Sequence, residues 1–182
     1  MAIAKYPKTC ATNVAGNSMV GFANVGDIDA ITIASGEITA ITAATDFKEY
    51  DAELDSIQYT WEAKAGASGW VTNKLICNFG KLTNTLITAI EAIEAQVACG
   101  VQACWLDNNG TGWLGGYSED EEDTRSMRIA ESTFDSGKKP SDEDMQQVIL
   151  TLTWESKTRA LPFDSTISGT LTDGTAAFVD WN

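Results

Sequence analysis

The chain has 182 residues and a formal net charge of −14, from 26 acidic and 12 basic residues. This length is enough for one well-buried core and marginal for two. A surface of this charge repels nucleic acid and anionic membranes, because binding to phosphates requires Lys and Arg side chains that displace counterions. The composition therefore argues against a protein that grips DNA or a membrane, whereas a wall past which DNA slides fits this sign of charge.

The chain contains no histidine. That absence removes the commonest general base, the commonest metal ligand and every Ser-His triad. A carboxylate pair of the glycosidase type remains open among the 26 acids, but no spacing in the sequence nominates one. We expect no enzymatic activity, no cofactor and no metal site.

The cysteines form neither a Cys-x-x-Cys pair nor a cluster of zinc ligands. Two of them, Cys77 and Cys104, lie in apolar strand contexts, where a free thiol behaves as a small hydrophobe. We expect reduced, buried cysteines, and hence synthesis in a reducing cytoplasm. The full set is Cys10, Cys77, Cys99 and Cys104.

No targeting segment is visible. Residues 1–9 lack the apolar region of a signal peptide. No stretch of the chain approaches the ~20 apolar residues of a membrane span. We expect no membrane partner.

In chain order, residues 1–26 are poor in large apolar side chains, and we expect an extended N-terminal arm with at most short strands. Residues 27–182 are expected to form a single β-sandwich domain whose tail, from residue 162 onward, is rich in Thr, Ser and Gly. Within this domain, residues 27–44 contain two β-branched runs about Ser35-Gly36, which predicts a hairpin. Residues 45–55 form a charged connector.

Four later stretches alternate between apolar and polar residues with the period of two that is typical of strands. They are residues 57–62, 70–79, 125–134 and 147–154. Three tryptophans share the parity of the apolar strand residues and are predicted to lie in the core: Trp61, Trp105 and Trp154. Trp70 and Trp113 flank turns and are the pair expected at the surface, where a carbohydrate-binding interpretation would need them.

One amphipathic helix is predicted after the second of these strands. Its apolar stripe consists of Leu86, Ile90, Ile93 and Val97. Thr83 or Asn84 can cap its N-terminus, and Gly100 can close its C-terminus with a positive φ. Together the elements predict a mainly β (α+β) fold, a β-sandwich or barrel of about eight strands with one flanking helix.

Residues 104–117 read as two short strands joined by the turn Asp107-Asn108-Asn109-Gly110. Asn and Gly tolerate the positive φ that tight hairpin turns need. A calcium loop would require alternating oxygen ligands and a distal Glu, which this segment lacks. A hairpin is the interpretation that the residues favour.

An acidic run follows this hairpin. Three interpretations of it are open: a divalent-cation site, a surface that faces a lumen, and a solvated loop between two strands. The run consists of Glu119, Asp120, Glu121, Glu122 and Asp123.

The order of elements over residues 56–154 resembles that of the major tail tube protein of tailed bacteriophages. A strand with Asp-Asn-Asn-Gly followed by Trp113-Leu114-Gly115 recurs in that group, as does the long alternating strand that comes later. The resemblance implies a β-sandwich with a flanking helix, six copies of which form a ring whose sheets join into one inner β-barrel. Stacked rings then make a tube through which the genome passes.

The resemblance also implies partners, synthesis in the cytoplasm of a bacterial host and a place in the virion tail. The protein would bind itself and other tail proteins, such as the tape measure, the terminator and a baseplate or sheath, while DNA passes without specific binding. The acidic run would be a candidate for the lumen. The connector resembles the extended loop that reaches the adjacent ring, with candidates Asp46, Lys48, Glu49 and Asp51. The alternatives left open are a capsid-decoration or tail-tip protein and a carbohydrate-binding β-sandwich module.

Overall fold

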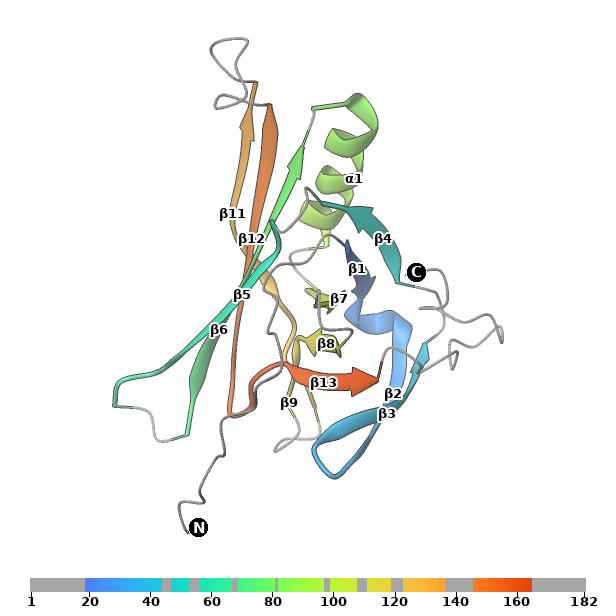
Figure 1. Ribbon diagram of the computed structural model, residues 1–182, viewed down its shortest axis with the longest axis vertical. Helices are drawn as coiled ribbons and strands as arrows, with labels where there is room; N and C mark the ends of the chain where they lie inside the picture. Colours follow the sequence, from blue (N-terminus) through green and yellow to red (C-terminus); the bar gives the residue numbers. More distant parts are fainter. Residues whose placement is uncertain are drawn as a thin grey trace, which may run out of the picture.

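Two β-sheets face one another in this protein, and one helix packs beside them (Figure 1). The structure is a computed structural model. It describes residues 19–43, 47–52, 56–66, 69–80, 82–96, 99–107, 111–118, 123–136 and 146–164. The prediction of a mainly β sandwich with one helix is confirmed for these residues.

The larger sheet has seven strands in the order β2-β3-β13-β8-β7-β1-β4, and it is open, because β2 and β4 form its two edges. Its neighbours are antiparallel except for β13 and β3, which run parallel. The strands are β1 (Met19–Asn24), β2 (Ile28–Ala34), β3 (Glu37–Ala43), β4 (Lys48–Asp51), β7 (Val101–Leu106), β8 (Thr111–Gly115) and β13 (Leu161–Asp164). A 3-10 turn, η1 (Val25–Asp27), links β1 to β2.

The smaller sheet has four strands in the order β11-β12-β6-β5, and every neighbouring pair is antiparallel. Its strands are β5 (Gln58–Ala63), β6 (Val71–Gly80), β11 (Arg128–Asp135) and β12 (Gln147–Ser156). A separate two-stranded pair is formed by β9 (Tyr117–Ser118) and β10 (Asp123–Thr124).

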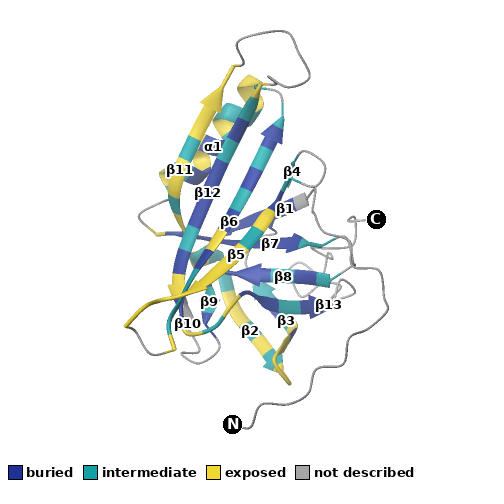
Figure 2. Cartoon of the chain, turned by 60° about the vertical axis from the view of Figure 1, so that its left-hand side comes forward, coloured by how far each residue is buried: buried dark blue, intermediate teal, exposed yellow. Residues whose placement is uncertain are grey.

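The core lies between the two sheets. Side chains alternate along β6 and β12, so that one face of the smaller sheet is buried and the other is turned outward (Figure 2). Register pairs such as Leu75 with Leu152 and Cys77 with Leu150 lie on the buried face. Trp105 and Trp154 are buried in the same cluster, which confirms their predicted core positions.

Two hairpins confirm predictions made from turn residues. The hairpin of β2 and β3 turns at Ser35 and Gly36, which both have positive φ, 57° and 82°. Such angles are those of a tight hairpin turn. The hairpin of β7 and β8 flanks the predicted Asp-Asn-Asn-Gly turn, and the Thr111 N–H donates to Asp107 Oδ1 at 2.9 Å. Residues 108–110 of that turn lie outside the described residues.

The helix α1 (Asn84–Ala95) begins where its capping residue predicts. The Leu86 N–H donates to Thr83 Oγ1 at 3.1 Å, which satisfies one of the free donors of the first turn. Ile90 and Ile93 are buried, as the apolar stripe predicts. The helix ends before the predicted closing residue, although Gly100 does have a positive φ of 82° and its N–H donates to the Gln96 carbonyl.

The buried helix stripe makes a first prediction. Ile90 has no exposed surface, so Ile90→Ala is expected to lower the free energy of unfolding by about 2–5 kcal/mol through lost transfer energy and the cavity left behind. Chemical denaturation measures the change. Thr88→Ala, at an exposed position of the same helix, is the matched control, and equal stability of the two variants would show that the stripe does not face the core.

The predicted N-terminal arm with at most short strands is corrected for residues 19–24, because the short strand found there is part of the sandwich. Met19–Asn24 forms β1, which pairs with β7 on one side and β4 on the other. Val20 and Phe22 are buried in the core cluster. The small residues Gly21 and Ala23 alternate with Val20 and Phe22, so the sequence shows no clear strand pattern here. Position 21 nevertheless needs a glycine, because a Cβ on Gly21 would lie 2.9 Å from Cys104 Sγ. Residues 1–18 lie outside the described residues.

The C-terminal part of the described chain also departs from expectation. Residues 162–164, where the Thr-, Ser- and Gly-rich tail is expected to begin, belong to β13, and Phe163 is buried in the second core cluster. The Phe163 ring lies over Gly112 of the neighbouring strand, so that a Cβ on Gly112 would come within 2.1 Å of Phe163 Cε2. The rest of the Thr-, Ser- and Gly-rich segment, residues 165–182, is not described.

This close approach makes a second prediction. Gly112→Ala is expected to destabilise the protein by about 1–3 kcal/mol, because the added methyl group forces the Phe163 ring out of its site. The control is Gly26→Ala, since a Cβ at Gly26 meets nothing within 4 Å. A melting temperature that falls for Gly26→Ala as much as for Gly112→Ala would refute the packing argument.

Candidate assembly surface

The four-stranded sheet has two open edges. Within the described residues, β5 pairs only with β6, and β11 pairs only with β12. An edge strand presents unpaired backbone N–H and C=O groups that a strand from another chain can bind. β11 carries a bulge between Ile129 and Glu131, with Ala130 as the extra residue.

The exposed large hydrophobic side chains of the described residues lie on these two edges. Trp61 on β5 is 42% exposed, and Phe134 on β11 is 40% exposed. Both have the parity of the buried face, since Trp61 is opposite Asn73 and Phe134 is opposite Val148. The prediction that Trp61 lies in the core is therefore wrong, because its strand is the last of the sheet and no further strand covers it.

A groove of about 770 Å³ lies beside Trp61 at the β5 edge. The Arg159 guanidinium stacks on the Trp61 ring at 3.5 Å from the centroid, a cation–π contact. The remaining lining residues are Tyr59, Thr60, Trp113 and Ala160. The groove is thus an aromatic surface with one cation, suited to cover by an apolar or aromatic side chain.

Hydrogen bonds fix the walls of this groove. The Tyr59 hydroxyl donates to Asn73 Oδ1 at 2.7 Å and accepts from the Ala160 N–H at 2.9 Å. Burial raises the pKa of Tyr59, so this hydroxyl stays protonated at neutral pH. Trp113 donates from Nε1 to Asp107 Oδ2 at 3.0 Å. Trp113 and Trp70, predicted to be at the surface, are both half-buried.

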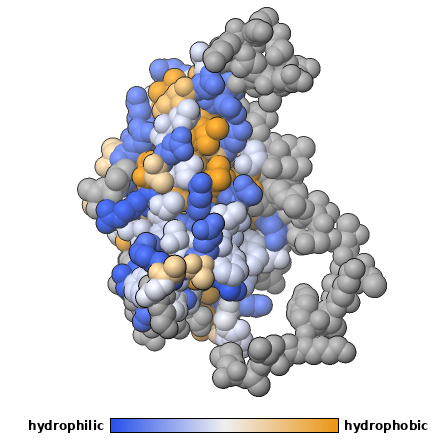
Figure 3. Space-filling view, turned by 90° about the vertical axis from the view of Figure 1, so that its left-hand side faces the viewer, coloured by the Kyte–Doolittle hydropathy of each residue, from blue (hydrophilic) through white to orange (hydrophobic). Residues whose placement is uncertain are grey.

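The outer face of the four-stranded sheet is mostly polar. Seen from this side, hydrophilic atoms spread over the surface and apolar atoms gather in its upper half (Figure 3). The half-buried side chains of Ile76 and Ile149 are apolar members of this face. Its charged residues, from the register of the strands, are four acids and two bases: Glu62, Glu131, Asp135, Glu155, Lys74 and Arg128.

One end of this face is more cationic. A pocket there is lined by Arg125, Arg128 and Glu155, among others. The Arg125 guanidinium lies 5.5 Å from the centroid of the Trp70 ring. Glu155 accepts a salt bridge from Lys64 at 2.7 Å, with both side chains about half exposed. Lys64 lies just beyond β5 and pairs with Glu155, so the excess of acids on this face holds for the residues within the strands alone.

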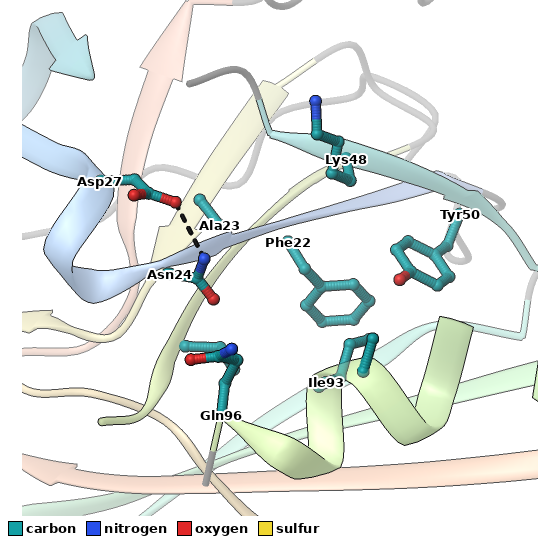
Figure 4. A pocket seen from close by; sticks show the side chains of 10 residues that line it. Phe22, Ala23, Asn24, Asp27, Lys48, Tyr50, Ile93 and Gln96 are labelled. Carbon is teal, nitrogen blue, oxygen red and sulfur yellow. Dashed lines mark hydrogen bonds between the residues drawn. The ribbon is translucent and has the colours of Figure 1, made fainter. Parts of the chain in front are cut away.

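A second hollow lies between β1, β4 and α1 (Figure 4). Phe22 and Tyr50 meet edge to face with ring centroids 5.1 Å apart, and Ile93 of the helix packs nearby. Asn24 donates from Nδ2 to Asp27 Oδ2 at 2.9 Å at its rim. The hollow lies between the helix and the sheet, and its polar lining includes Asn24, Asp27, Lys48 and Gln96.

The acidic run lies at the small hairpin of β9 and β10. Asp123 pairs with Ser118, so the run spans the connection between these two strands. Asp123, the last residue of the run, is therefore a strand residue rather than part of a loop. Residues 119–122 lie outside the described residues, and the assignment to a lumen stays a prediction.

The predicted inter-ring loop is corrected in part. Lys48, Glu49 and Asp51 belong to β4, which pairs with β1, rather than to an extended loop. Phe47, just before this strand, is buried. It is the apolar residue that could have indicated a strand in this otherwise charged segment of the sequence. Asp46 lies outside the described residues.

The prediction of free, buried cysteines is confirmed for Cys77 and Cys104, and the burial that it includes is wrong for Cys99. Cys77 and Cys104 are buried and form no disulfide, while Cys99 is exposed. Burial raises the pKa of the Cys77 thiol, so it stays protonated and unreactive at neutral pH. Cys10 lies outside the described residues.

The described part of the chain contains no group of three or more His, Cys, Asp or Glu side chains that could hold a metal ion. Its helix is too short to cross a membrane. No protein-family model, curated protein or solved structure matches this chain.

Proposed function

We propose that the protein is a structural subunit of a phage tail tube, located in the virion tail, in which copies form rings and rings stack into a conduit for DNA. The observation that carries this proposal is the four-stranded antiparallel sheet with two open edges, each bearing an exposed aromatic side chain. Exposed aromatics on both edges of one sheet are what an edge-to-edge joint between copies needs.

The strand directions support a ring. In a sheet of four antiparallel strands, the first and last strands run in opposite directions, so β5 of one copy lies antiparallel to β11 of the next. A head-to-tail joint of this kind repeats until it closes, and closure leaves no edge of the four-stranded sheets exposed. The family that the sequence resembles closes such rings with six copies.

The surface chemistry supports a conduit. When the sheets of a ring join, the polar outer face of the four-stranded sheet lines the channel. Within the strands, four acids against two bases give this face a net charge of −2, 2 minus 4, and Lys64 beyond the end of β5 pairs with one of these acids, Glu155. Such a wall does not bind phosphates, so DNA passes without being held. The opposite surface and the ring faces are left for other rings and other tail proteins.

Sedimentation velocity over a wide concentration range, followed by negative-stain microscopy, tests the proposal. We expect rings and tubes, and more of them as salt rises, because a chain with net charge −14 repels its copies and screening shortens that repulsion to about 8 Å at physiological ionic strength. A protein that stays monomeric at every concentration and salt tested is not a tube subunit.

A second candidate function is carbohydrate binding, favoured by the aromatic groove around Trp61, Trp113 and Arg159. Aromatic rings of this kind stack on pyranose faces. Tryptophan fluorescence titrated with a panel of oligosaccharides tests it. Quenching that saturates in wild type and is lost in Trp61→Ala would favour this function over assembly.

A further inference from the structure

The pairings within the four-stranded sheet show how far apart its two exposed aromatics lie. Trp61 is level with Asn73 on β6 and with Trp154 on β12. Phe134 is level with Val148, which is six residues from Trp154 along β12. Six residues span about 20 Å at about 3.3 Å each. Copies joined without any offset along the strands would therefore keep Trp61 and Phe134 apart.

Closure into a barrel imposes an offset. Barrel strands tilt typically by about 35–45° from the barrel axis. Four strands about 4.8 Å apart are about 19 Å wide, and this width times the tangent of the tilt gives an offset of about 13–19 Å per copy. That distance is about four to six residues, whatever the number of copies. An even offset is required, because an odd one would exchange the two faces of the sheet.

The direction of the offset follows from strand handedness. Because strands twist to the right, they wind right-handed around a barrel. Seen from the outer face, β11 lies on the left with its arrow upward and β5 lies on the right (Figure 2). If this face lines the channel, the offset brings the C-terminal half of β11 beside β5 of the neighbouring copy. Phe134 lies in that half.

Two registers fit these conditions, and charge distinguishes them. An offset of four residues places Glu62 opposite Glu131 of the next copy, and like charges directly opposite one another destabilise a strand pair. An offset of six residues places Glu62 opposite Thr133 instead. It also places Trp61 opposite Phe134.

We propose that β5 of one copy pairs with β11 of the next in this six-residue offset, so that Trp61 faces Phe134 across the joint and Thr60 faces Asp135. This inference rests on the proposed tube function. The register covers both exposed aromatics at once, and the groove beside Trp61 receives the Phe134 ring. Aromatic pairs are among the cross-strand contacts that stabilise sheets.

Disulfide trapping tests the register. Thr60, Thr133 and Asp135 are exposed, so cysteines there leave the subunit core intact. In a background with Cys10→Ser and Cys99→Ser, the variant Thr60→Cys with Asp135→Cys is expected to form a ladder of covalent multimers on mild oxidation. Its matched control, Thr60→Cys with Thr133→Cys, reports the four-residue offset. Directly opposite Cβ atoms lie about 4.5–5.5 Å apart and diagonal ones about 7–8 Å, so the control should give a much weaker ladder.

The outcomes separate the register from the function. Suppose that the background protein forms rings or tubes, but the control pair gives the stronger ladder or neither pair gives one. This result would overturn the register and leave the tube function standing. Suppose instead that a variant with Thr60→Cys as its one added cysteine forms covalent dimers. Such dimers would indicate that β5 pairs with β5 of a second copy about a two-fold axis, and they would overturn both the register and the head-to-tail ring. A background protein that never assembles would overturn both.

Discussion

Phe134→Lys is expected to yield a folded subunit that no longer forms rings or tubes. The side chain is 40% exposed on the edge strand β11, so its replacement leaves the subunit core unchanged. At a joint between copies, however, the lysine ammonium would be buried without a partner. An uncompensated buried charge costs about 3–5 kcal/mol, and every joint of a ring carries one.

A cost of that size corresponds to at least a hundredfold rise in the concentration needed for assembly, at about 1.4 kcal/mol per factor of ten. Thr88→Lys, on the exposed side of α1, adds the same charge away from both edges and is the control. Circular dichroism melts establish that both variants fold, and sedimentation with negative-stain microscopy measures assembly. If Phe134→Lys forms tubes at the same concentration as the wild type, the β11 edge is not part of the joint between copies.

The elements with strong periodicity were predictable from the sequence. The strands β6 and β12 alternate between more and less buried residues over most of their length, because one face of their sheet packs on the core, and buried Thr151 is an exception in β12. The helix carries a side-chain cap at Thr83 and an apolar stripe, and both are local signals. These features depend on neighbours in the chain, which is why the sequence alone reveals them.

Elements that depend on tertiary pairing were missed. β4 and β13 consist of four residues each, so they are too short to show a period against their surroundings. β1 has six residues, but its alternate positions Gly21 and Ala23 are small rather than polar and give no contrast to Val20 and Phe22. All three are strands because neighbours from distant parts of the chain pair with them. β1, for example, lies between β4 and β7.

The candidate assembly surface also depends on tertiary pairing, which is why the sequence did not reveal it. Trp61 has the parity of a core residue, and nothing local distinguishes it from Trp154. Its exposure follows from the position of β5 at the end of the sheet, which the order of strands determines. An edge is a property of topology, so the sequence predicted the sandwich but not the surface by which copies would join.

The outer face of the four-stranded sheet carries the second large expected effect. Glu62→Lys with Glu155→Lys changes that face from four acids and two bases to two acids and four bases, and the chain from −14 to −10. We expect tubes of this variant to retain DNA, because each ring then presents circles of lysines to the phosphates. Retention should fall steeply with salt. The logarithm of the DNA-binding constant falls linearly with the logarithm of the salt concentration, and each phosphate contact adds about 0.9 to the steepness of that fall.

Co-sedimentation of tubes with short duplex DNA across a salt series measures this effect. The matched control is Glu91→Lys with Glu94→Lys on α1, which gives the same net charge of −10 on a surface outside the four-stranded sheet. Because the two variants have the same net charge, any difference in the DNA that they retain depends on where the lysines lie. The channel assignment predicts DNA in the pellet with the sheet variant and little with the helix variant. Equal retention by both would show that the outer face of the sheet does not line the channel, even if tubes form.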